Sequence, residues 1–234
     1  MVVGADITEH KKFEMEMLRF DRLNLVGEMA AGISHEIRNP LTTVRGFLQM
    51  LSVKNECAGY RDYYVLMIEE LDRTNSIITE FLSLGRNKNV KLEVQNLNKI
   101  VHALAPLIEA NAAAEEKSMA LDLGEIPELL LNEKEIRQVV LNLARNALEA
   151  MSNGGTLWIR TFSEEDEVVL AVEDEGTGID PEIFPKLGTP FLTTKEQGTG
   201  LGLAVCYSIA GRHNARITVD SSPQGTSFNV KFSQ

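Results

Sequence analysis

The sequence predicts a multidomain chain, an all-α helical hairpin followed by an α/β sandwich domain. Before residue 85, apolar residues recur every three or four positions over two long stretches, which is the spacing of one face of an α-helix. Beyond residue 90, short runs rich in β-branched residues alternate with stretches of helical periodicity, a pattern typical of an α/β domain. A length of 234 residues allows one or two domains.

The first domain is expected to be an antiparallel pair of helices. Apolar periodicity runs from about residue 13 to residue 51, breaks at the polar segment 52–59, and resumes until Gly85, a residue type that commonly follows a helix end. A single hairpin of this kind exposes a broad apolar face. Pairing with a second copy in a dimeric four-helix bundle would bury that face, and the rest of the same chain is the alternative cover.

The second domain follows residues 86–90, which have the composition of a linker. It is expected to contain roughly four or five strands and three helices. Asn132 is placed as the N-cap of the second helix. The expected helices are 97–114, 133–151 and a third that ends near Gly211; the expected strands are 91–94, 119–123, and the antiparallel pairs 156–162 with 167–174 and 215–221 with 226–232.

The composition excludes several classes of function. A net charge of −11 disfavours binding to nucleic acid in the absence of a basic patch. No apolar run approaches the ~18–20 residues that span a bilayer, and the N-terminus is too polar for a signal peptide. Cys57 and Cys206 form no metal-ligand or disulfide pattern, which favours reduced thiols. We therefore expect this fragment to be cytoplasmic, with membrane attachment only through segments upstream of it.

Two glycine-rich segments of the second domain have the composition of a nucleotide site. Asp174 ends an expected strand and precedes Gly176 and Gly178, so its carboxylate can accept a hydrogen bond from an exocyclic amine while the glycines let the backbone approach a flat ring. The segment GTGLGLA, residues 198–204, begins a helix, where backbone N–H groups form an anion site suited to phosphates. This segment does not follow a strand in a βαβ unit, which argues against a dinucleotide-binding fingerprint.

Two further segments add polar groups of the right kind. Asn142 and Asn146 lie four residues apart on one face of an expected helix, and amide oxygens are hard ligands that suit Mg²⁺. Thr193, Thr194 and Lys195 supply hydroxyls and a cation beside the glycine loop. Each segment alone is explained equally well by a turn or a solvated helix face. All four segments together, in the chain order asparagine pair, Asp-x-Gly-x-Gly, Thr-Thr-Lys and Gly-x-Gly-x-Gly, indicate a nucleotide site.

Six motifs in order make the chain resemble the transmitter portion of a bacterial sensor histidine kinase over residues 13–234. ISHEIRNPL resembles the H-box of that family, NLARNALEA the N-box, DEGTGI the first glycine box, PFLTTK the F-box, GTGLGLA the second glycine box and QGTSFNV the closing Gly-Thr strand. Many members have IFEPFFTTK where this chain has IFPKLGTPFLTTK, and this variant favours the sporulation-type kinases.

The resemblance implies four parts of the chain. Residues 1–12 resemble the tail of a PAS sensor domain, residues 13–85 a dimerisation and histidine phosphotransfer domain, and residues 86–90 a linker. Residues 91–234 then resemble the catalytic ATP-binding domain, whose fold is shared with gyrase, heat-shock-90 and mismatch-repair ATPases. The implied partners are a second copy in a homodimer, the receiver domain of a response regulator, and small antikinase inhibitor proteins at the apolar base of the bundle.

The resemblance also implies ATP and Mg²⁺ as cofactors. Asp174 then reads adenine, Asn146 binds Mg²⁺ with Asn142 assisting, and Lys195 holds the phosphates together with the second glycine box. The residues implied to contact the bound nucleotide are Asn142, Asn146, Asp174, Gly176, Gly178, Thr193, Thr194, Lys195, Gly198, Gly200, Leu201, Gly202 and Thr226.

His35 is the candidate phosphoryl acceptor. It points away from the apolar stripe of its expected helix, and an imidazole is substantially neutral at cytosolic pH, which leaves one nitrogen free as a nucleophile. Glu36 can accept the proton of the other nitrogen. In the family, Glu36 and Asn39, spaced as E-x-x-N, also resemble the motif that orients water for dephosphorylation of the partner. The other three histidines have no adjacent carboxylate within a hairpin helix.

Pro40 lies within the same apolar periodicity, where a proline removes the hydrogen bond to the carbonyl of Glu36 and typically costs ~3 kcal/mol. Our hypothesis is that this weakened turn, one turn after the candidate nucleophile, lets the helix flex between signalling states.

Three classes of function compete. The first is an ATP-dependent protein histidine kinase that phosphorylates His35 and relays the phosphoryl group to an aspartate of a response regulator. The second is a conformational ATPase of the same fold, but such enzymes use a water-activating carboxylate in the asparagine helix, where Gln138 stands four residues before Asn142. The third is a non-catalytic phosphotransfer or scaffold protein, which the intact nucleotide motifs argue against. We expect the kinase, with a role in sporulation.

Overall fold

The computed structural model describes residues 37–84, 90–195 and 198–233. His35 and Glu36 lie outside the described residues. The chain forms two compact units, Met1–Lys88 and Asn89–Gln234. The predicted fold class, a helical region followed by an α/β domain, is confirmed; the assembly into a bundle stays a prediction, as do the domain limits.

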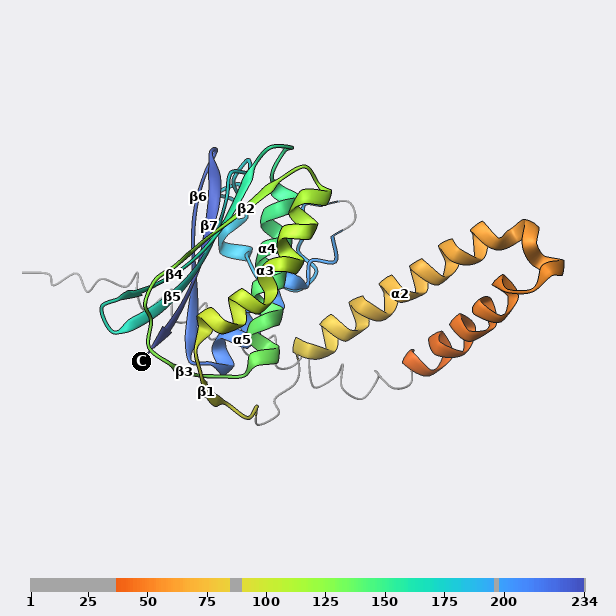
Figure 1. The fold of residues 1–234 in the computed structure, drawn as a ribbon, viewed down its shortest axis with the longest axis horizontal. Helices are drawn as coiled ribbons and strands as arrows, with labels where there is room; N and C mark the ends of the chain where they lie inside the picture. The colour runs from red at the N-terminus through yellow and green to blue at the C-terminus, as the bar shows by residue number, and fades with distance from the viewer. Residues whose placement is uncertain (1–36, 85–89, 196–197, 234) are drawn as a thin grey trace, which may run out of the picture. The chain divides into compact units, whose positions relative to one another are not determined.

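The first unit contains a helix over residues 37–52 and α2 (Arg61–Leu84), joined through the short 3-10 helix η1 (Asn55–Tyr60). The two long helices lie side by side and antiparallel (Figure 1). The guanidinium of Arg45 donates two hydrogen bonds to the carboxylate of Asp72, from Nε to Oδ1 at 2.6 Å and from Nη2 to Oδ2 at 3.1 Å. A bidentate pair of this kind requires a defined geometry, so it sets the register of the two helices.

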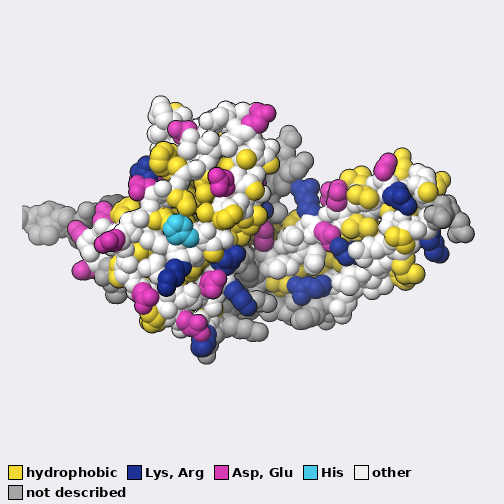
Figure 2. Space-filling view, in the orientation of Figure 1, with side chains coloured by type: hydrophobic (Ala, Val, Ile, Leu, Met, Phe, Trp, Pro, Cys, Tyr) yellow, Lys and Arg dark blue, Asp and Glu magenta, His cyan; other side chains and the backbone are white. Residues whose placement is uncertain are grey.

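The hairpin has little core of its own. Among the described residues of the hairpin, Leu84 at the end of α2 is the one apolar residue whose side chain is buried. Val44, Phe47 and Met50 on the first helix are between 48% and 61% exposed. Figure 2 shows apolar side chains spread over the face of the hairpin that is turned towards the viewer. A two-helix unit therefore leaves a large apolar area uncovered.

Pro40 lies inside the helix over residues 37–52 and does not end it. The hydroxyl of Thr42 donates to the carbonyl oxygen of Arg38 at 2.9 Å, and that of Thr43 donates to the carbonyl oxygen of Asn39 at 3.1 Å. Such bonds to the fourth preceding carbonyl often bend a helix. In the turn that contains the proline, threonine hydroxyls therefore compete with backbone N–H groups for the carbonyl oxygens of Arg38 and Asn39.

The second unit is built on a five-stranded sheet with the order β2-β4-β5-β7-β6. β2 pairs with β4 in parallel and the other neighbours are antiparallel. Both antiparallel pairs predicted from the sequence are confirmed. The strands of this sheet are β2 (Ser118–Leu123), β4 (Thr156–Glu164), β5 (Glu167–Asp174), β6 (Ala215–Ser222) and β7 (Gly225–Ser233).

A separate two-stranded ribbon pairs β1 (Glu93–Gln95) with β3 (Leu129–Leu131). The described part of the chain thus has seven strands, more than the four or five expected. β3 was missed because three residues of the same type, Leu-Leu-Leu, carry no alternation from which a strand can be recognised.

Three helices, α3 (Leu97–Ala114), α4 (Glu133–Ala150) and α5 (Gly202–Arg212), cover one face of the sheet (Figure 1). Their predicted limits are confirmed to within one residue. Asn132 is the N-cap of α4, as expected, and its Oδ1 accepts the backbone N–H of Glu135 at 3.1 Å. Apolar side chains of the central strands, among them Ile159 and Leu170, are fully buried beneath these helices.

The opposite face of the sheet carries paired charges. Arg216 contacts Glu167 at 2.8 Å and Lys231 contacts Glu164 at 2.7 Å, in both cases between side chains of different strands. This face also carries Val169, which stands opposite Lys231 and is fully buried, so it combines surface ion pairs with apolar side chains. Among the described residues, no helix combines the length and the apolarity that a bilayer crossing requires.

Candidate nucleotide-binding site

Asp174 ends β5, and its side chain is held in a fixed position. Its Oδ1 accepts the backbone N–H of Gly176 at 2.8 Å and that of Thr226 at 3.3 Å. Burial raises the pKa of the Asp174 carboxyl, while these two hydrogen bonds and the positive charge of Lys195 act in the opposite direction. Within the described residues no donor reaches Oδ2, so that oxygen can accept a hydrogen bond from a ligand amine.

The glycines after Asp174 allow the backbone to pack closely around it. A Cβ at Gly176 would lie 2.7 Å from the carbonyl oxygen of Ala150, at the end of α4. Gly178 has φ +77°, and a Cβ there would lie 2.1 Å from the carbonyl oxygen of Ser222. Side chains at these two positions would push the strand end, α4 and the β6–β7 turn apart. The glycines therefore create the close backbone that the sequence predicted around Asp174.

A serine that sequence reasoning missed completes this corner. The Oγ of Ser221 accepts the backbone N–H of Ile179 at 2.8 Å and lies 3.0 Å from the Oγ1 of Thr226. Thr226 is thus held from two sides, by Ser221 through its hydroxyl and by Asp174 through its backbone. A lone serine in a strand offers no pattern that would have identified this role.

The two asparagines of α4 have different surroundings. Asn142 is buried, and its Nδ2 donates to the carbonyl oxygen of Gly202 at 3.1 Å, which joins α4 to the first residue of α5. The amide of Asn146 is half-buried, and within the described residues it makes no hydrogen bond. Asn142 therefore positions the glycine segment, while the amide of Asn146 is available to a ligand. This arrangement fits a metal ligand at Asn146 better than at Asn142.

The second glycine segment folds back on the residues that precede it. Phe191 donates its backbone N–H to the carbonyl oxygen of Gly200 at 3.0 Å, and both residues have positive φ. The hydroxyl of Thr193 accepts the backbone N–H of Lys195 at 3.1 Å, and Thr193 and Thr194 are both exposed. A Cβ at Gly198 would lie 2.4 Å from that same hydroxyl. The side chain of Leu201 is fully buried, so its backbone alone can face a ligand.

Lys195 reaches α4, the helix that carries the asparagine pair. Its Nζ lies 2.5 Å from Oε2 of Glu149 and 3.5 Å from the carbonyl oxygen of Asn146. The ammonium group of Lys195, the predicted phosphate-binding residue, thus lies beside the turn of α4 that carries Asn146, the predicted metal ligand. Glu149 was not singled out from the sequence, although its position three residues after Asn146 places it on the same side of the helix.

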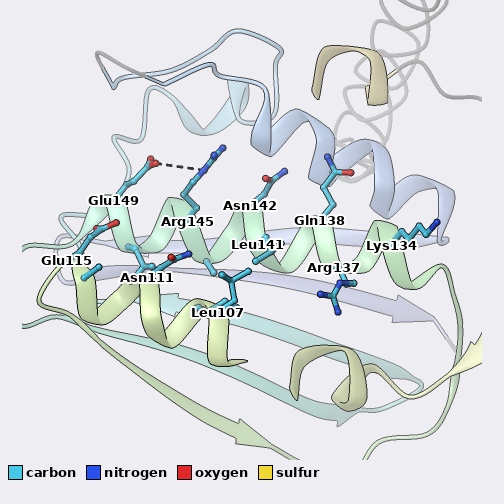
Figure 3. A pocket seen from close by; sticks show the side chains of 14 residues that line it. Leu107, Asn111, Glu115, Lys134, Arg137, Gln138, Leu141, Asn142, Arg145 and Glu149 are labelled. Atoms are coloured by element: carbon cyan, nitrogen blue, oxygen red, sulfur yellow. Dashed lines mark ion pairs between the residues drawn. The ribbon is translucent and has the colours of Figure 1, made fainter. Parts of the chain in front are cut away.

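A groove of about 730 Å³ runs along α3 and α4 (Figure 3). Asn142, Arg145 and Glu149 project from one side of α4 at its edge, while Leu107 and Asn111 of α3 form the opposite wall. Apart from Asn142, none of the residues predicted to contact nucleotide lines it. The candidate site is therefore the corner around Asp174 and the glycine segments, and the groove lies next to it.

The predicted phosphoacceptor and its carboxylate lie outside the described residues. Asn39, the third residue of that set, is exposed on the helix over residues 37–52. The described parts of the site thus show where the nucleotide residues lie, and the roles of all these residues, including His35 and Glu36, stay predictions.

A buried carboxylate at a strand end, an asparagine helix and a glycine segment at the start of a helix, on a sheet covered on one face, define an ATPase domain of the histidine kinase and gyrase class. The family model "Histidine kinase-, DNA gyrase B-, and HSP90-like ATPase" matches residues 131–234. The model "His Kinase A (phospho-acceptor) domain" matches residues 25–90. The chain therefore carries the phospho-acceptor domain and the ATPase domain of the sensor histidine kinases.

Its relatives include two sporulation kinases of Bacillus subtilis (strain 168). Sporulation kinase E is 38% identical over 233 residues, which cover 98% of this chain and 31% of that protein. Sporulation kinase A is 39% identical over 241 residues, which cover 99% of this chain and 38% of that protein. The chain thus spans about a third of the length of these relatives.

Solved structures of the family have the same fold. Full-length ShkA in complex with AMPPNP aligns with a TM-score of 0.80 and 25% identity, covering 89% of this chain and 46% of that one. Histidine kinase ThkA, in complex with the response regulator protein TrrA, aligns with a TM-score of 0.64 and 28% identity over 98% of this chain and 68% of that one.

Proposed function

We propose that this chain is an ATP-dependent histidine kinase that phosphorylates itself on His35 and passes the phosphoryl group to an aspartate of a response regulator. The observation that carries the proposal is the convergence of Asp174, Asn146 and Lys195 on one corner of the α/β domain, in a chain whose first domain matches a phosphoacceptor family. In this proposal residues 13–85 form the phosphotransfer domain and residues 91–234 the catalytic domain.

Each residue of the corner has a distinct task. Oδ2 of Asp174 accepts a hydrogen bond from the exocyclic amine of adenine, while Gly176 and Gly178 allow the backbone to lie close to the ring. Lys195 and the backbone of residues 198–202 hold the phosphates at the start of α5. The amide oxygen of Asn146 is the protein ligand for Mg²⁺, which when bound supplies charge neutralisation between the phosphates. AMPPNP in the related ShkA supports a nucleoside triphosphate as the ligand.

The transfer itself needs a neutral imidazole. One ring nitrogen of His35 attacks the γ-phosphorus, a P–N bond forms as the bond to the bridging oxygen breaks, and ADP leaves. Glu36 accepts a hydrogen bond from the other ring nitrogen, which fixes the tautomer of the nucleophile. In a separate reaction, Glu36 and Asn39 orient a water molecule that attacks the phosphorus on the partner's aspartate, so that the P–O bond to the carboxylate breaks and inorganic phosphate leaves.

Labelling tests the proposal directly. After incubation with γ-labelled ATP, we expect acid-labile and base-stable label on the wild-type chain and none on His35→Gln. His102→Gln is the matched control, because His102 is exposed on α3 and should leave the label unchanged. Label that persists in His35→Gln would refute the assignment. ATP hydrolysis without any label would favour a conformational ATPase.

The same proposal includes a homodimer formed through the hairpin. The exposed apolar side chains of both helices support it, because a second copy would cover them in a four-helix bundle. Sedimentation at micromolar concentration is expected to give a dimer for the wild type and a monomer for the double variant Phe47→Glu, Met50→Glu. A wild-type monomer would contradict this part.

A receiver domain is the proposed acceptor, by analogy with ThkA and its response regulator. The likeness to sporulation kinases A and E favours a receiver that serves sporulation. Small antikinase proteins that contact the apolar base of the hairpin are a further part of the proposal.

A further inference from the structure

Glu149 forms an ion pair with Lys195, the lysine of the candidate nucleotide site. Its Oε2 lies 2.5 Å from Nζ of Lys195, and its Oε1 lies 3.9 Å from Nε of Arg145, one turn earlier on α4. Figure 3 shows Glu149 and Arg145 side by side on α4. The carboxylate of Glu149 thus stands between two cations. The ammonium group of Lys195, which is proposed to contact phosphates, therefore already has a counter-ion.

The pair is placed where an incoming anion can compete for it. The side chains of Lys195 and Glu149 are 37% and 40% exposed, so water and solutes reach both groups. An anion that approaches Nζ also approaches the carboxylate, and two negative charges at that distance repel each other. A phosphate therefore cannot gain the full attraction of Lys195 while the carboxylate keeps its present position.

The pair also connects two parts of the site. Lys195 precedes the second glycine segment, which begins at Gly198, and Glu149 and Asn146 belong to α4. Breaking the pair would leave the Nζ of Lys195 with one described contact to α4, the hydrogen bond to the carbonyl oxygen of Asn146 at 3.5 Å. At that length the hydrogen bond is weak, so the ammonium group could then turn towards a ligand.

We propose that Glu149 is a positioning residue that sets the nucleotide affinity of this kinase, by holding Lys195 in the ligand-free protein and releasing it when phosphates bind. The proposal rests on the phosphate role of Lys195 proposed above. Before a ligand binds, Glu149 keeps Lys195 in an ion pair, and each binding event has to break that contact. The apparent affinity is reduced by the fraction of molecules in which the lysine is held.

The size of the effect follows from the exposure of the pair. Half-exposed ion pairs of this kind stabilise their contact only modestly, so we expect about a twofold to fivefold change in affinity when the pair is removed. The change should be larger for a triphosphate than for a diphosphate, because the triphosphate brings more negative charge towards the carboxylate.

The test is a double-mutant cycle by titration calorimetry with a non-hydrolysable ATP analogue and Mg²⁺. Glu149→Gln is expected to bind the analogue about two to five times more tightly than wild type. In the Lys195→Met background, the same change is expected to have a clearly smaller effect, because the carboxylate then has no lysine to hold. Glu133→Gln is the matched control, because it removes the same charge from the same helix. Glu133 also lies on α4 and also pairs with an arginine four residues away, at 3.7 Å.

The outcomes separate the sources of error. Equal tightening in the Lys195→Met background would overturn the proposal, because Glu149 would then repel phosphate without acting through the lysine. Weaker binding by Glu149→Gln would also overturn it and would indicate a metal ligand. If Lys195→Met binds as tightly as wild type, the phosphate role of Lys195 itself is wrong. If that variant binds weakly while Glu149→Gln equals wild type, Lys195 keeps its role and Glu149 has none.

Discussion

Nε2 of His213 accepts the backbone N–H of Asn132 at 3.0 Å. The contact joins the end of α5 to the N-cap of α4, and Nδ1 of the same ring lies 2.9 Å from the carbonyl oxygen of Ile209. A neutral imidazole with its proton on Nδ1 satisfies both contacts, whereas a protonated ring would have to break the contact to Asn132. The histidine is thus a structural link between the two helices that frame the nucleotide site.

This link predicts a pH dependence of stability. Burial lowers the pKa of His213, so the unfolded chain takes up a proton near pH ~6.5 while the folded domain does not. The contribution is complete above pH ~6.5 and is lost as the pH falls towards the lowered pKa, by at most ~1.4 kcal/mol per pH unit. Urea unfolding followed by the fluorescence of Trp158, the single tryptophan, should show this slope. His102→Gln should keep the slope and His213→Gln should reduce it; equal slopes would contradict the prediction.

Asp174→Asn should weaken nucleotide binding. The amide can still accept the two backbone N–H groups, but its other end presents a donor to the adenine amine, and an unsatisfied pair of this kind costs ~1–3 kcal/mol. We expect ADP affinity to fall about tenfold or more by calorimetry. Glu175→Gln is the matched control, because the neighbouring carboxylate accepts the backbone N–H of Thr156 at 2.9 Å and belongs to the β4 side. Unchanged ADP affinity in Asp174→Asn would show that another group reads the base.

Gly178→Ala should destabilise the α/β domain more than Gly154→Ala. Both glycines have positive φ, +77° and +86°, but a Cβ at Gly154 meets nothing within 4 Å, whereas one at Gly178 meets a backbone oxygen. The conformational penalty alone is ~1–2 kcal/mol, so we expect that cost for Gly154→Ala and ~2–4 kcal/mol for Gly178→Ala. Urea unfolding by Trp158 fluorescence measures both, and equal losses would show that the close approach at Gly178 is not required.

Pro40→Ala should stabilise the hairpin and lower the rate of autophosphorylation. Restoring the amide N–H removes a cost of ~3 kcal/mol and stiffens the turn where Thr42 and Thr43 already bond to earlier carbonyls. Circular dichroism and single-turnover labelling measure the two effects. Pro106→Ala is the control, because Pro106 also lies inside a helix, α3, in the other unit. An unaltered rate in Pro40→Ala would show that the proline has no part in signalling.

Features that depend on neighbouring residues can be predicted from the sequence of this chain. The limits of α3 and α4 follow from apolar periodicity, and the N-cap of α4 follows from an asparagine at its start, because these features depend on residues within one or two turns. The nucleotide motifs are recognisable for the same reason, since each is a short run of residues with its own backbone demands. The parallel pairing of β2 with β4 cannot be predicted in this way, because the two strands are separated by α4 and no local pattern records their register.

The sequence by itself therefore determined the class of each domain, the order of the helices and most strands, and the residues that we propose for the nucleotide site. Only the tertiary structure decided what those residues touch. It placed Lys195 against Glu149 across 46 residues, Asn142 against Gly202 across 60, and Ser221 beside Thr226 at the corner of Asp174. Contacts of this kind arise from the packing of helices on a sheet, and side chains of ordinary type acquire their roles there through position alone.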